Sequence, residues 1–144
     1  EGRILYFTRP AEGVITSEFG PREQIKTKNG TTSPIHWGID VANEEGTPIY
    51  PAESGYVIDK AYNEVFGNYV IINHEGESWT GLCTLYAHMS EPSSVNVGDI
   101  VTPDMCIGKM GATGMATGPH LHFEFRDIRG GIVEKKNPRD YIDF

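Results

Sequence analysis

The sequence predicts an all-β fold, because β-branched residues outnumber helix formers and turn residues recur at short intervals. Isoleucine and valine together number 23 of the 144 residues, whereas leucine and alanine number 11. Branched side chains fit the pleated surface of a sheet, and leucine and alanine favour helices. Glycine and proline recur about every 8–12 residues, which is typical of a sandwich or barrel. We therefore expect a single domain of mainly antiparallel strands with very little helix.

Nine short strands are expected, and the clearest is the last. In residues 120–127 the polar side chains alternate with Leu121, Phe123 and Phe125, so one face of this strand is polar and the other apolar. The other expected strands are Arg3–Thr8, Ile15–Phe19, His36–Val41, Gly55–Tyr62, Asn68–His74, Thr80–His88, Asp99–Val101 and Met105–Met110. Residues 21–34 are polar and contain glycine, so we expect a long surface loop there.

Composition excludes several classes of protein. The chain has 12 basic and 20 acidic residues, a net charge of −8, and it lacks the basic stripe of a nucleic-acid binder. No apolar stretch approaches the ~20 residues that span a bilayer. The first residues do not form a signal peptide, so we expect an intracellular protein or an excised mature domain. Cys83 and Cys106 are too few for a disulfide scaffold, and we expect two reduced, buried thiols.

Two histidines separated by one residue form the first candidate site. His120 and His122 share a face of their strand, so both imidazoles can reach one metal ion. The preceding segment, residues 111–119, is rich in glycine and other small residues, and we expect it to leave open space above the two histidines. The alternative is a pair of polar residues on the wet face of a sheet.

His36 and Asp40 form the second candidate element. In a straight strand they would lie ~13 Å apart, too far to share a metal, but a bend or bulge at Gly38 would bring them together. With the histidine pair they complete a two-histidine, one-carboxylate set, which is typical of a catalytic zinc site with one position left for water. The same set also suits iron, so composition leaves the metal open.

Two further histidines and two tryptophans are less specific. His88 ends an expected strand, where catalytic groups are common, although a hydrogen-bonded structural histidine is the alternative. His74 has no partner motif, and we expect it to be structural. Trp37 and Trp79 fit either the core or the wall of a groove.

Taken in chain order, six blocks of sequence resemble the lysostaphin-type (LytM-like) zinc endopeptidases, which are peptidoglycan hydrolases. The resemblance extends from about Gly13 to Tyr141. The blocks are Ile15–Arg22, His36–Asp40, Gly46–Ile49, Gly67–Ile72, Thr84–His88 and Thr117–Glu124.

The resemblance implies a fold, an activity and a site. It implies a two-sheet barrel-sandwich with a long substrate groove, formed by one metallopeptidase domain over residues 1–144 with its core at about 13–141. His36, Asp40 and His122 would bind one Zn²⁺ per chain, and His88 and His120 would be the catalytic pair. Some members carry a tyrosine in the loop before the first ligand; residues 26–35 contain none, so that role is assigned to no residue.

The implied reaction is hydrolysis of peptide cross-links in bacterial peptidoglycan by metal-activated water. Zinc lowers the pKa of bound water toward ~7 and polarises the scissile carbonyl, one histidine acts as general base, and the other stabilises the oxyanion. The sequence leaves open which histidine is the base. The resemblance further implies a monomeric domain acting on peptidoglycan outside the cell, in the periplasm or on a phage tail.

Two other functions remain to be weighed. A catalytically silent binding or regulatory domain of the same fold would lack at least one of the five site residues, and all five are present. A non-haem iron oxygenase of the cupin type also uses two histidines and a carboxylate. By resemblance, that type carries its histidine pair early in the chain, whereas here His122 lies 22 residues from the end.

Overall fold

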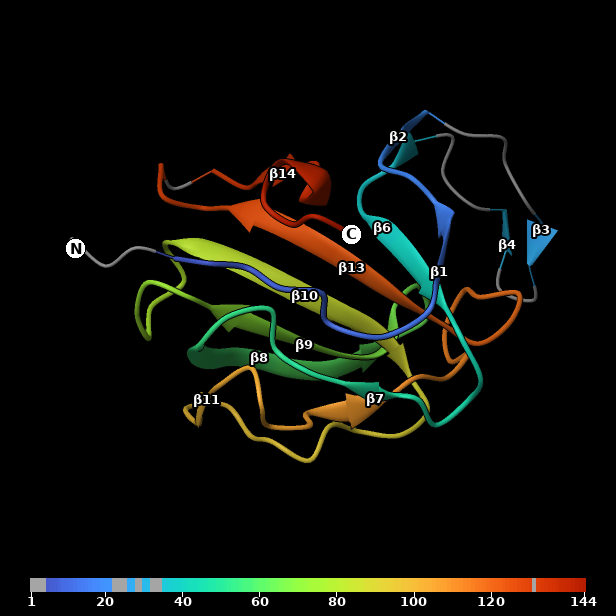
Figure 1. The fold of residues 1–144 in the computed structure, drawn as a ribbon, viewed down its shortest axis with the longest axis horizontal. Coiled ribbons are helices and arrows are strands. Elements are labelled where there is room, and N and C mark those ends of the chain that lie inside the picture. Colours follow the sequence, from blue (N-terminus) through green and yellow to red (C-terminus); the bar gives the residue numbers. More distant parts are fainter. Residues whose placement is uncertain (1–4, 22–25, 28–29, 32–34, 131) are drawn as a thin grey trace.

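The structure is a computed structural model, and it describes residues 5–21, 35–130 and 132–144 together with the backbone of 26–27 and 30–31. Most of these residues lie in strands or in the turns between them (Figure 1). The one helix among the described residues is a short 3-10 helix, Pro138–Asp140. No helix in these ranges is long and apolar enough to cross a membrane.

Eight strands form one antiparallel sheet in the order β1-β6-β13-β10-β9-β8-β11, with β14 beside β13. Strand β13 is central: β6 pairs with its first half, β14 with its second half, and β10 runs along its other edge. The strands are β1 (Val14–Ser17), β6 (Ile39–Ala42), β8 (Gly55–Asn63), β9 (Gly67–Asn73), β10 (Leu82–Met89), β11 (Ile100–Val101), β13 (His120–Asp127) and β14 (Glu134–Lys136).

Three pairs of two-residue strands accompany this sheet. Strand β7 (Pro48–Ile49) pairs with β12 (Gly108–Lys109), and β2 (Gly20–Pro21) pairs with β5 (Ile35–His36). Strand β3 (Lys26–Thr27) pairs with β4 (Gly30–Thr31). Strand β5 leads almost directly into β6, so the β2–β5 pair fixes the position of His36 relative to β6.

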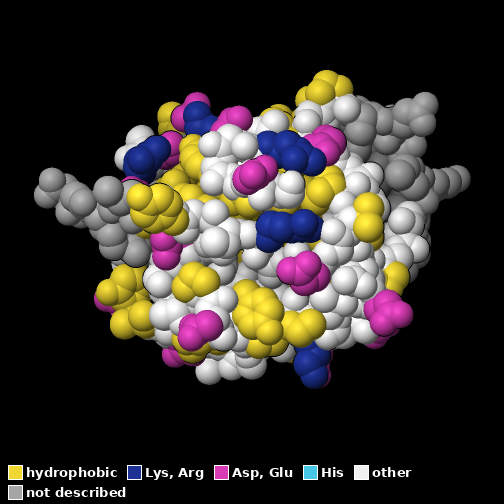
Figure 2. Space-filling view, in the orientation of Figure 1, with side chains coloured by type: hydrophobic (Ala, Val, Ile, Leu, Met, Phe, Trp, Pro, Cys, Tyr) yellow, Lys and Arg dark blue, Asp and Glu magenta, His cyan; other side chains and the backbone are white. Residues whose placement is uncertain are grey.

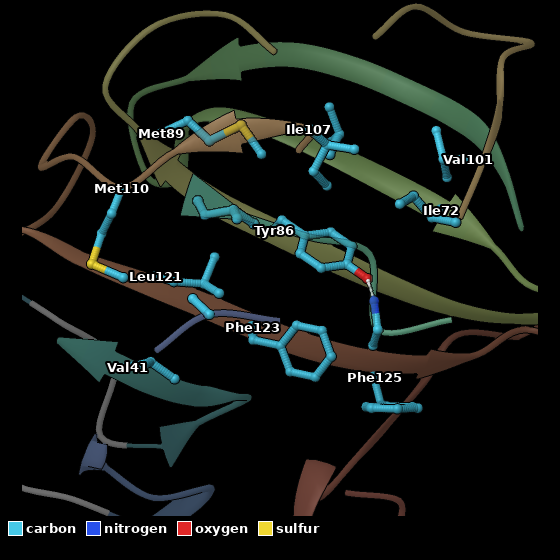
Figure 3. Packing of buried hydrophobic residues seen from close by; sticks show 14 of the residues in the cluster. Val41, Ile72, Tyr86, Met89, Val101, Ile107, Met110, Leu121, Phe123 and Phe125 are labelled. Carbon is cyan, nitrogen blue, oxygen red and sulfur yellow. Dashed lines mark hydrogen bonds between the residues drawn. The ribbon is translucent and has the colours of Figure 1, made fainter. Parts of the chain in front are cut away.

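The main core lies on the face of the sheet that the β7–β12 pair covers. Tyr86 and Phe123, from neighbouring strands, are fully buried there and pack edge to face. Ile107, which precedes β12, belongs to the same cluster (Figure 3), and so does Ile49 of β7. Burying apolar side chains between two layers is the main source of stability in such a fold. The two-layer packing fits the expected barrel-sandwich.

The opposite face of the sheet carries a smaller apolar cluster. Cys83, Leu85 and Ala87 of β10 point to this face, because side chains alternate along a strand. In the register of the sheet, Ala87 lies opposite His122, and Leu85 lies opposite Glu124. The two histidines of β13 and the acidic residue that follows therefore lie above this second cluster.

A series of buried hydrogen bonds links Tyr86, Thr84 and His74 inside the fold. The Tyr86 hydroxyl accepts the Ala52 N–H at 2.9 Å and hydrogen-bonds the Thr84 hydroxyl at 2.7 Å. His74 hydrogen-bonds Thr84 through Nε2 and the Ser54 carbonyl through Nδ1. Both imidazole nitrogens of His74 are thus satisfied inside the fold, which agrees with the structural role expected for it.

The all-β class and the antiparallel arrangement are confirmed, whereas several local expectations were wrong. Residues 5–8 form no strand; they run across the core face, where Leu5 and Phe7 pack against the main cluster. The expected loop at 21–34 contains β3 and β4, although 22–25, 28–29 and 32–34 lie outside the described residues. Strand β14 was not expected, because its three residues are all charged.

The expectation of two buried thiols was wrong for one cysteine. Both cysteines are free, and Cys83 is buried, but Cys106 is exposed. The apolar neighbours of Cys106 in the sequence suggested burial, and Ile107 does turn into the core, but Met105 is exposed like Cys106. On the face shown in Figure 2, basic, acidic and apolar side chains are interspersed.

Candidate metal centre

Three side chains converge on one point at the start of β13. His36 Nε2 lies 3.1 Å from Asp40 Oδ1 and 3.1 Å from His122 Nδ1. His122 Nδ1 lies 3.0 Å from Asp40 Oδ1. The three atoms form a nearly equilateral triangle, the one arrangement of histidine, cysteine and acidic groups among the described residues with the spacing of a metal site.

The pairing of strands β6 and β13 brings two of these side chains together. Asp40 is the direct cross-strand partner of His122, and opposite residues in an antiparallel ladder project to the same face. The two residues are 82 positions apart in the sequence, and no local pattern predicts this register. It follows from packing the apolar faces of both strands into the main core.

The third side chain reaches the site because the chain bends at Gly38. Strand β5 ends at His36 and β6 begins at Ile39, so the expected single strand is interrupted as the sequence suggested. A Cβ at position 38 would lie 2.3 Å from the carbonyl oxygen of Phe123. Only glycine allows this close approach, which lets the His36 and Asp40 side chains meet.

The tautomers of the two histidines follow from their outer hydrogen bonds. His36 Nδ1 lies 2.9 Å from the Glu18 carbonyl, which can only accept, so Nδ1 carries the proton. His122 Nε2 lies 2.8 Å from a carboxylate oxygen of Glu124 and is likewise the donor. Both inner nitrogens then present lone pairs beside the Asp40 carboxylate. Such a cluster of acceptors is favourable only around a cation, so the residues fit a divalent metal.

The charge balance of the site supports the same conclusion. Burial would raise the pKa of Asp40, but without a metal the inner nitrogens of His122 and His36 lower it well below its usual range when they carry protons and donate them to its carboxylate. Burial would lower the pKa of His122, yet its bonds to Asp40 and Glu124 raise it to about 9. Without a metal, the site therefore holds a proton on His122. A metal ion competes for the same nitrogen and would displace that proton.

Glu124 is an outer partner whose role the sequence analysis missed. Its side chain is 1% exposed and binds His122 through one oxygen. The other oxygen accepts from Arg126 Nε at 2.8 Å and lies 3.8 Å from Lys135 Nζ. Burial would raise its pKa, but these groups lower it to about 2. The available signal was its position two residues after His122, on the same face of the strand.

His120 lies beside the triangle but is turned differently. Its Nδ1 lies 2.9 Å from the Gly118 carbonyl and so carries the proton. Its Nε2 lies 3.7 Å from Asp40 Oδ1, farther than either His36 or His122. His120 is thus next to the candidate metal position with a lone pair directed toward it.

His88 completes a pair with His120, and a bulge in β10 brings it there. The register between β10 and β9 shifts between Tyr86 and Met89, and His88 adopts φ +64°. Regular alternation would turn His88 into the core; the bulge redirects it to the site. The His88 and His120 ring centroids lie 4.7 Å apart. This positive φ is the only one of a non-glycine residue in the described ranges, and such strain is common at functional sites.

The environment of His88 keeps it neutral. Its Nδ1 lies 2.6 Å from the Thr113 carbonyl, which fixes the proton on Nδ1 and leaves Nε2 as an acceptor. Burial, followed by the nearby His120 and His122, lowers the pKa of His88 to about 3. A bound cation would act in the same direction.

The Gly-rich segment before β13 packs tightly at Gly111 and Gly114, whereas a Cβ at Gly118 would meet nothing within 4 Å. Cβ atoms at Gly111 and Gly114 would lie 2.4 Å from the Ser90 Cα and 2.2 Å from the Gly67 nitrogen. The missing side chains let this loop approach the residue after β10 and the β8–β9 turn closely. As a result, the Thr113 carbonyl reaches His88.

Aromatic side chains surround the site. Phe66 stacks on His122 with ring centroids 5.8 Å apart. Trp37 is 39% exposed and lies edge to face with Phe19, next to His36. Trp79 is more exposed and belongs to the turn after β9. Trp37 thus contacts Phe19 and, through its ring face, the Lys135 ammonium at 5.7 Å, whereas Trp79 lies outside the core.

Comparison with known proteins identifies relatives of the chain. The family model "Peptidase family M23" matches residues 34–138. The chain is 38% identical over 125 residues to the peptidoglycan DD-endopeptidase ShyC of Vibrio cholerae. The matched region covers 87% of this chain and 26% of ShyC. The chain thus spans about a quarter of the length of this curated relative.

Solved structures show the same fold. A zinc containing peptidase from Vibrio cholerae superposes with a TM-score of 0.72 at 31% identity, covering 92% of this chain and 39% of that one. The catalytic domain of the antimicrobial peptidase lysostaphin from Staphylococcus simulans gives a TM-score of 0.71 at 25% identity, covering 90% and 91%. The resemblance inferred from the six sequence blocks is confirmed.

Proposed function

Because the chain belongs to peptidase family M23, we propose that it is a zinc endopeptidase that hydrolyses peptide cross-links of bacterial peptidoglycan. The observation that carries the proposal is the triangle of His36, Asp40 and His122, with two further histidines facing it. A silent domain of this fold would have no use for five such side chains held with defined tautomers.

We assign the metal ligands to His36 Nε2, Asp40 Oδ1 and His122 Nδ1, with one Zn²⁺ per chain. Two imidazoles and one carboxylate are a ligand set of catalytic zinc sites, and the similarity to a solved zinc containing peptidase supports zinc over iron. When bound, zinc would polarise the scissile carbonyl and make water more acidic. Glu124 keeps His122 in the tautomer that this role requires.

We assign the proton transfers to His88 and His120. Each donates its Nδ1 proton to a backbone carbonyl, so each offers Nε2 to a substrate or water molecule at the site. One would accept the proton of the attacking water at Nε2, and this proton would then pass to the leaving amine. The other would donate to the developing oxyanion when its Nε2 also carries a proton. Two histidines that are each fixed by a backbone carbonyl suit this exchange, because neither needs to rotate.

The substrate is proposed from the relatives and the chemistry of the site. Several curated relatives are named as peptidoglycan DD-endopeptidases, which supports a peptide cross-link as the bond that is cut. Peptidoglycan lies outside the cytoplasmic membrane, so we propose periplasmic or extracellular action, as a secreted and bacteriolytic enzyme or on a phage tail. We propose that the domain acts as a monomer.

Digestion of purified peptidoglycans with different cross-links tests the proposal. The zinc-loaded protein should release fragments whose masses show one cleaved cross-link, and chelation should stop the release. His88→Ala should keep the metal and lower turnover by about 10²–10⁴-fold, because general acid–base groups contribute that much. No fragment from any cross-link type, with zinc bound, would refute the proposed function.

A further inference from the structure

Two basic side chains lie directly opposite each other beside the candidate metal centre. Arg126 of β13 and Lys135 of β14 are cross-strand partners, and such partners project to the same face of the sheet. Like charges in this position repel. In a chain of net charge −8, the placement of two cations on the face that carries His122 calls for an anion between them.

The anion within the fold balances only one of the two charges. Glu124 is the acidic side chain that both Arg126 and Lys135 approach, and both approach the same oxygen. Its other oxygen is occupied by His122. Asp59 lies on the same face and keeps its charge, with the Tyr69 hydroxyl donating to its carboxylate at 3.2 Å, but no ion pair joins it to Arg126 or Lys135 among the described residues. The Lys135 ammonium lies 5.7 Å from the centre of the Trp37 ring. Arg126 and Lys135 therefore share a single carboxylate oxygen, and the donors of Arg126 that do not bind it remain available to a ligand.

The guanidinium of Arg126 is held as a rigid donor. Its Nε is bound to Glu124, and its Cζ lies 5.7 Å from the centre of the Phe66 ring. The terminal Nη groups make no hydrogen bond to any described residue, and the side chain keeps 16% of its surface exposed. A planar guanidinium with two open donors matches a carboxylate, which it can bind through two parallel bonds.

We infer that Arg126, with Lys135, forms a subsite for a free carboxylate of the substrate peptide. This inference rests on the proposed function and adds a determinant of substrate choice. His122 stacks on Phe66, and Arg126 lies over Phe66, with each contact under 6 Å. An extended peptide spans ~3.3–3.6 Å per residue, so the carboxylate belongs within about three residues of the scissile bond. Peptides of peptidoglycan carry free carboxylates that some cell walls convert to amides.

A matched pair of synthetic cross-linked peptides tests the subsite. One peptide keeps the carboxylates next to the cross-link, and the other carries primary amides in their place. For the wild-type protein, kcat/KM should be about 10- to 100-fold higher for the free acid, the value expected for a charge-assisted hydrogen bond. Arg126→Gln should abolish this preference: both peptides share any loss that follows from removing the Arg126 bond to Glu124, but the ratio of their kcat/KM values should fall to about one. Arg129→Gln, which removes an exposed charge after the end of β13, should keep it.

The outcomes separate the subsite from the proposed function. Equal kcat/KM for both peptides, or an equal loss on both in Arg126→Gln, would overturn the subsite. The dissociation constants of both peptides, measured by calorimetry, provide a readout without turnover. If neither peptide is cut but the free acid binds more tightly and only with Arg126 intact, the subsite stands and the endopeptidase function falls. Zinc content measured on each variant shows whether the metal centre is intact.

Discussion

Replacing Glu124 with glutamine tests how the fold holds His122 in place. The change keeps the size of the side chain but removes its charge, so the His122 N–H loses a carboxylate acceptor 2.8 Å away. The pKa of Glu124, lowered from 4.5 to about 2, corresponds to a preference for the charged form of about 3 kcal/mol. His122 provides only part of this preference, because Arg126 and Lys135 also stabilise the charged carboxylate. We therefore expect Glu124→Gln to weaken metal binding by ~1.4–2.7 kcal/mol, or about 10–100-fold in affinity.

Competition with a chelator of known zinc affinity measures this loss directly. Glu124→Gln should release zinc at a lower chelator concentration than the wild type. Glu134→Gln is the matched control, because it removes the same charge from an exposed side chain on β14, and it should bind zinc as the wild type does. Unchanged zinc affinity in Glu124→Gln, or an equal loss in Glu134→Gln, would refute the role of Glu124 in orienting His122.

Three further predictions follow from the fold. Gly38→Ala should destabilise the protein by more than about 2 kcal/mol in chemical denaturation and lower its zinc content, because the new Cβ would meet the backbone of the facing strand. Gly130→Ala, whose Cβ would lie in open space, should change neither the stability nor the zinc content. A thiol reagent should modify one cysteine per native chain, Cys106, since burial raises the pKa of Cys83 to about 12; mass spectrometry that finds Cys83 labelled first would contradict this. The pKa of His88 is 6.5 in the unfolded chain but about 3 in the folded chain, so the folded state loses stability as the pH falls. Between pH 7 and 4.5 the wild type should lose about 2.5 kcal/mol more stability than His88→Asn. Parallel denaturation curves for the two proteins at both pH values would argue against a neutral, buried His88.

The parts of the site that follow a local pattern were predictable from sequence. The alternation in residues 120–127 identified β13 and the shared face of its two histidines. The spacing of His36 and Asp40 required a bend, and Gly38 was the residue able to provide it. In both cases the relevant geometry is set within about eight residues of chain.

The parts that depend on contacts distant in sequence were not predictable. The register that faces Asp40 with His122 arises from packing between β6 and β13, and no local pattern encodes it. The bulge that turns His88 toward the site depends on how β9 pairs with β10. Glu124 looked like one more polar residue of an alternating strand. Its hydrogen bond to His122 became evident only once burial and partners were known.

Zinc content of purified His120→Ala and His122→Ala proteins tests the central claim most directly. The two histidines share a strand face, but His122 Nδ1 lies 3.0 Å from Asp40 Oδ1, whereas His120 Nε2 lies at 3.7 Å. His120→Ala should keep about one zinc per chain and lose hydrolysis. His122→Ala should lose both, and moderate excess zinc should restore neither. A zinc-depleted His120→Ala protein beside a fully loaded His122→Ala protein would contradict the assignment of ligand and catalyst.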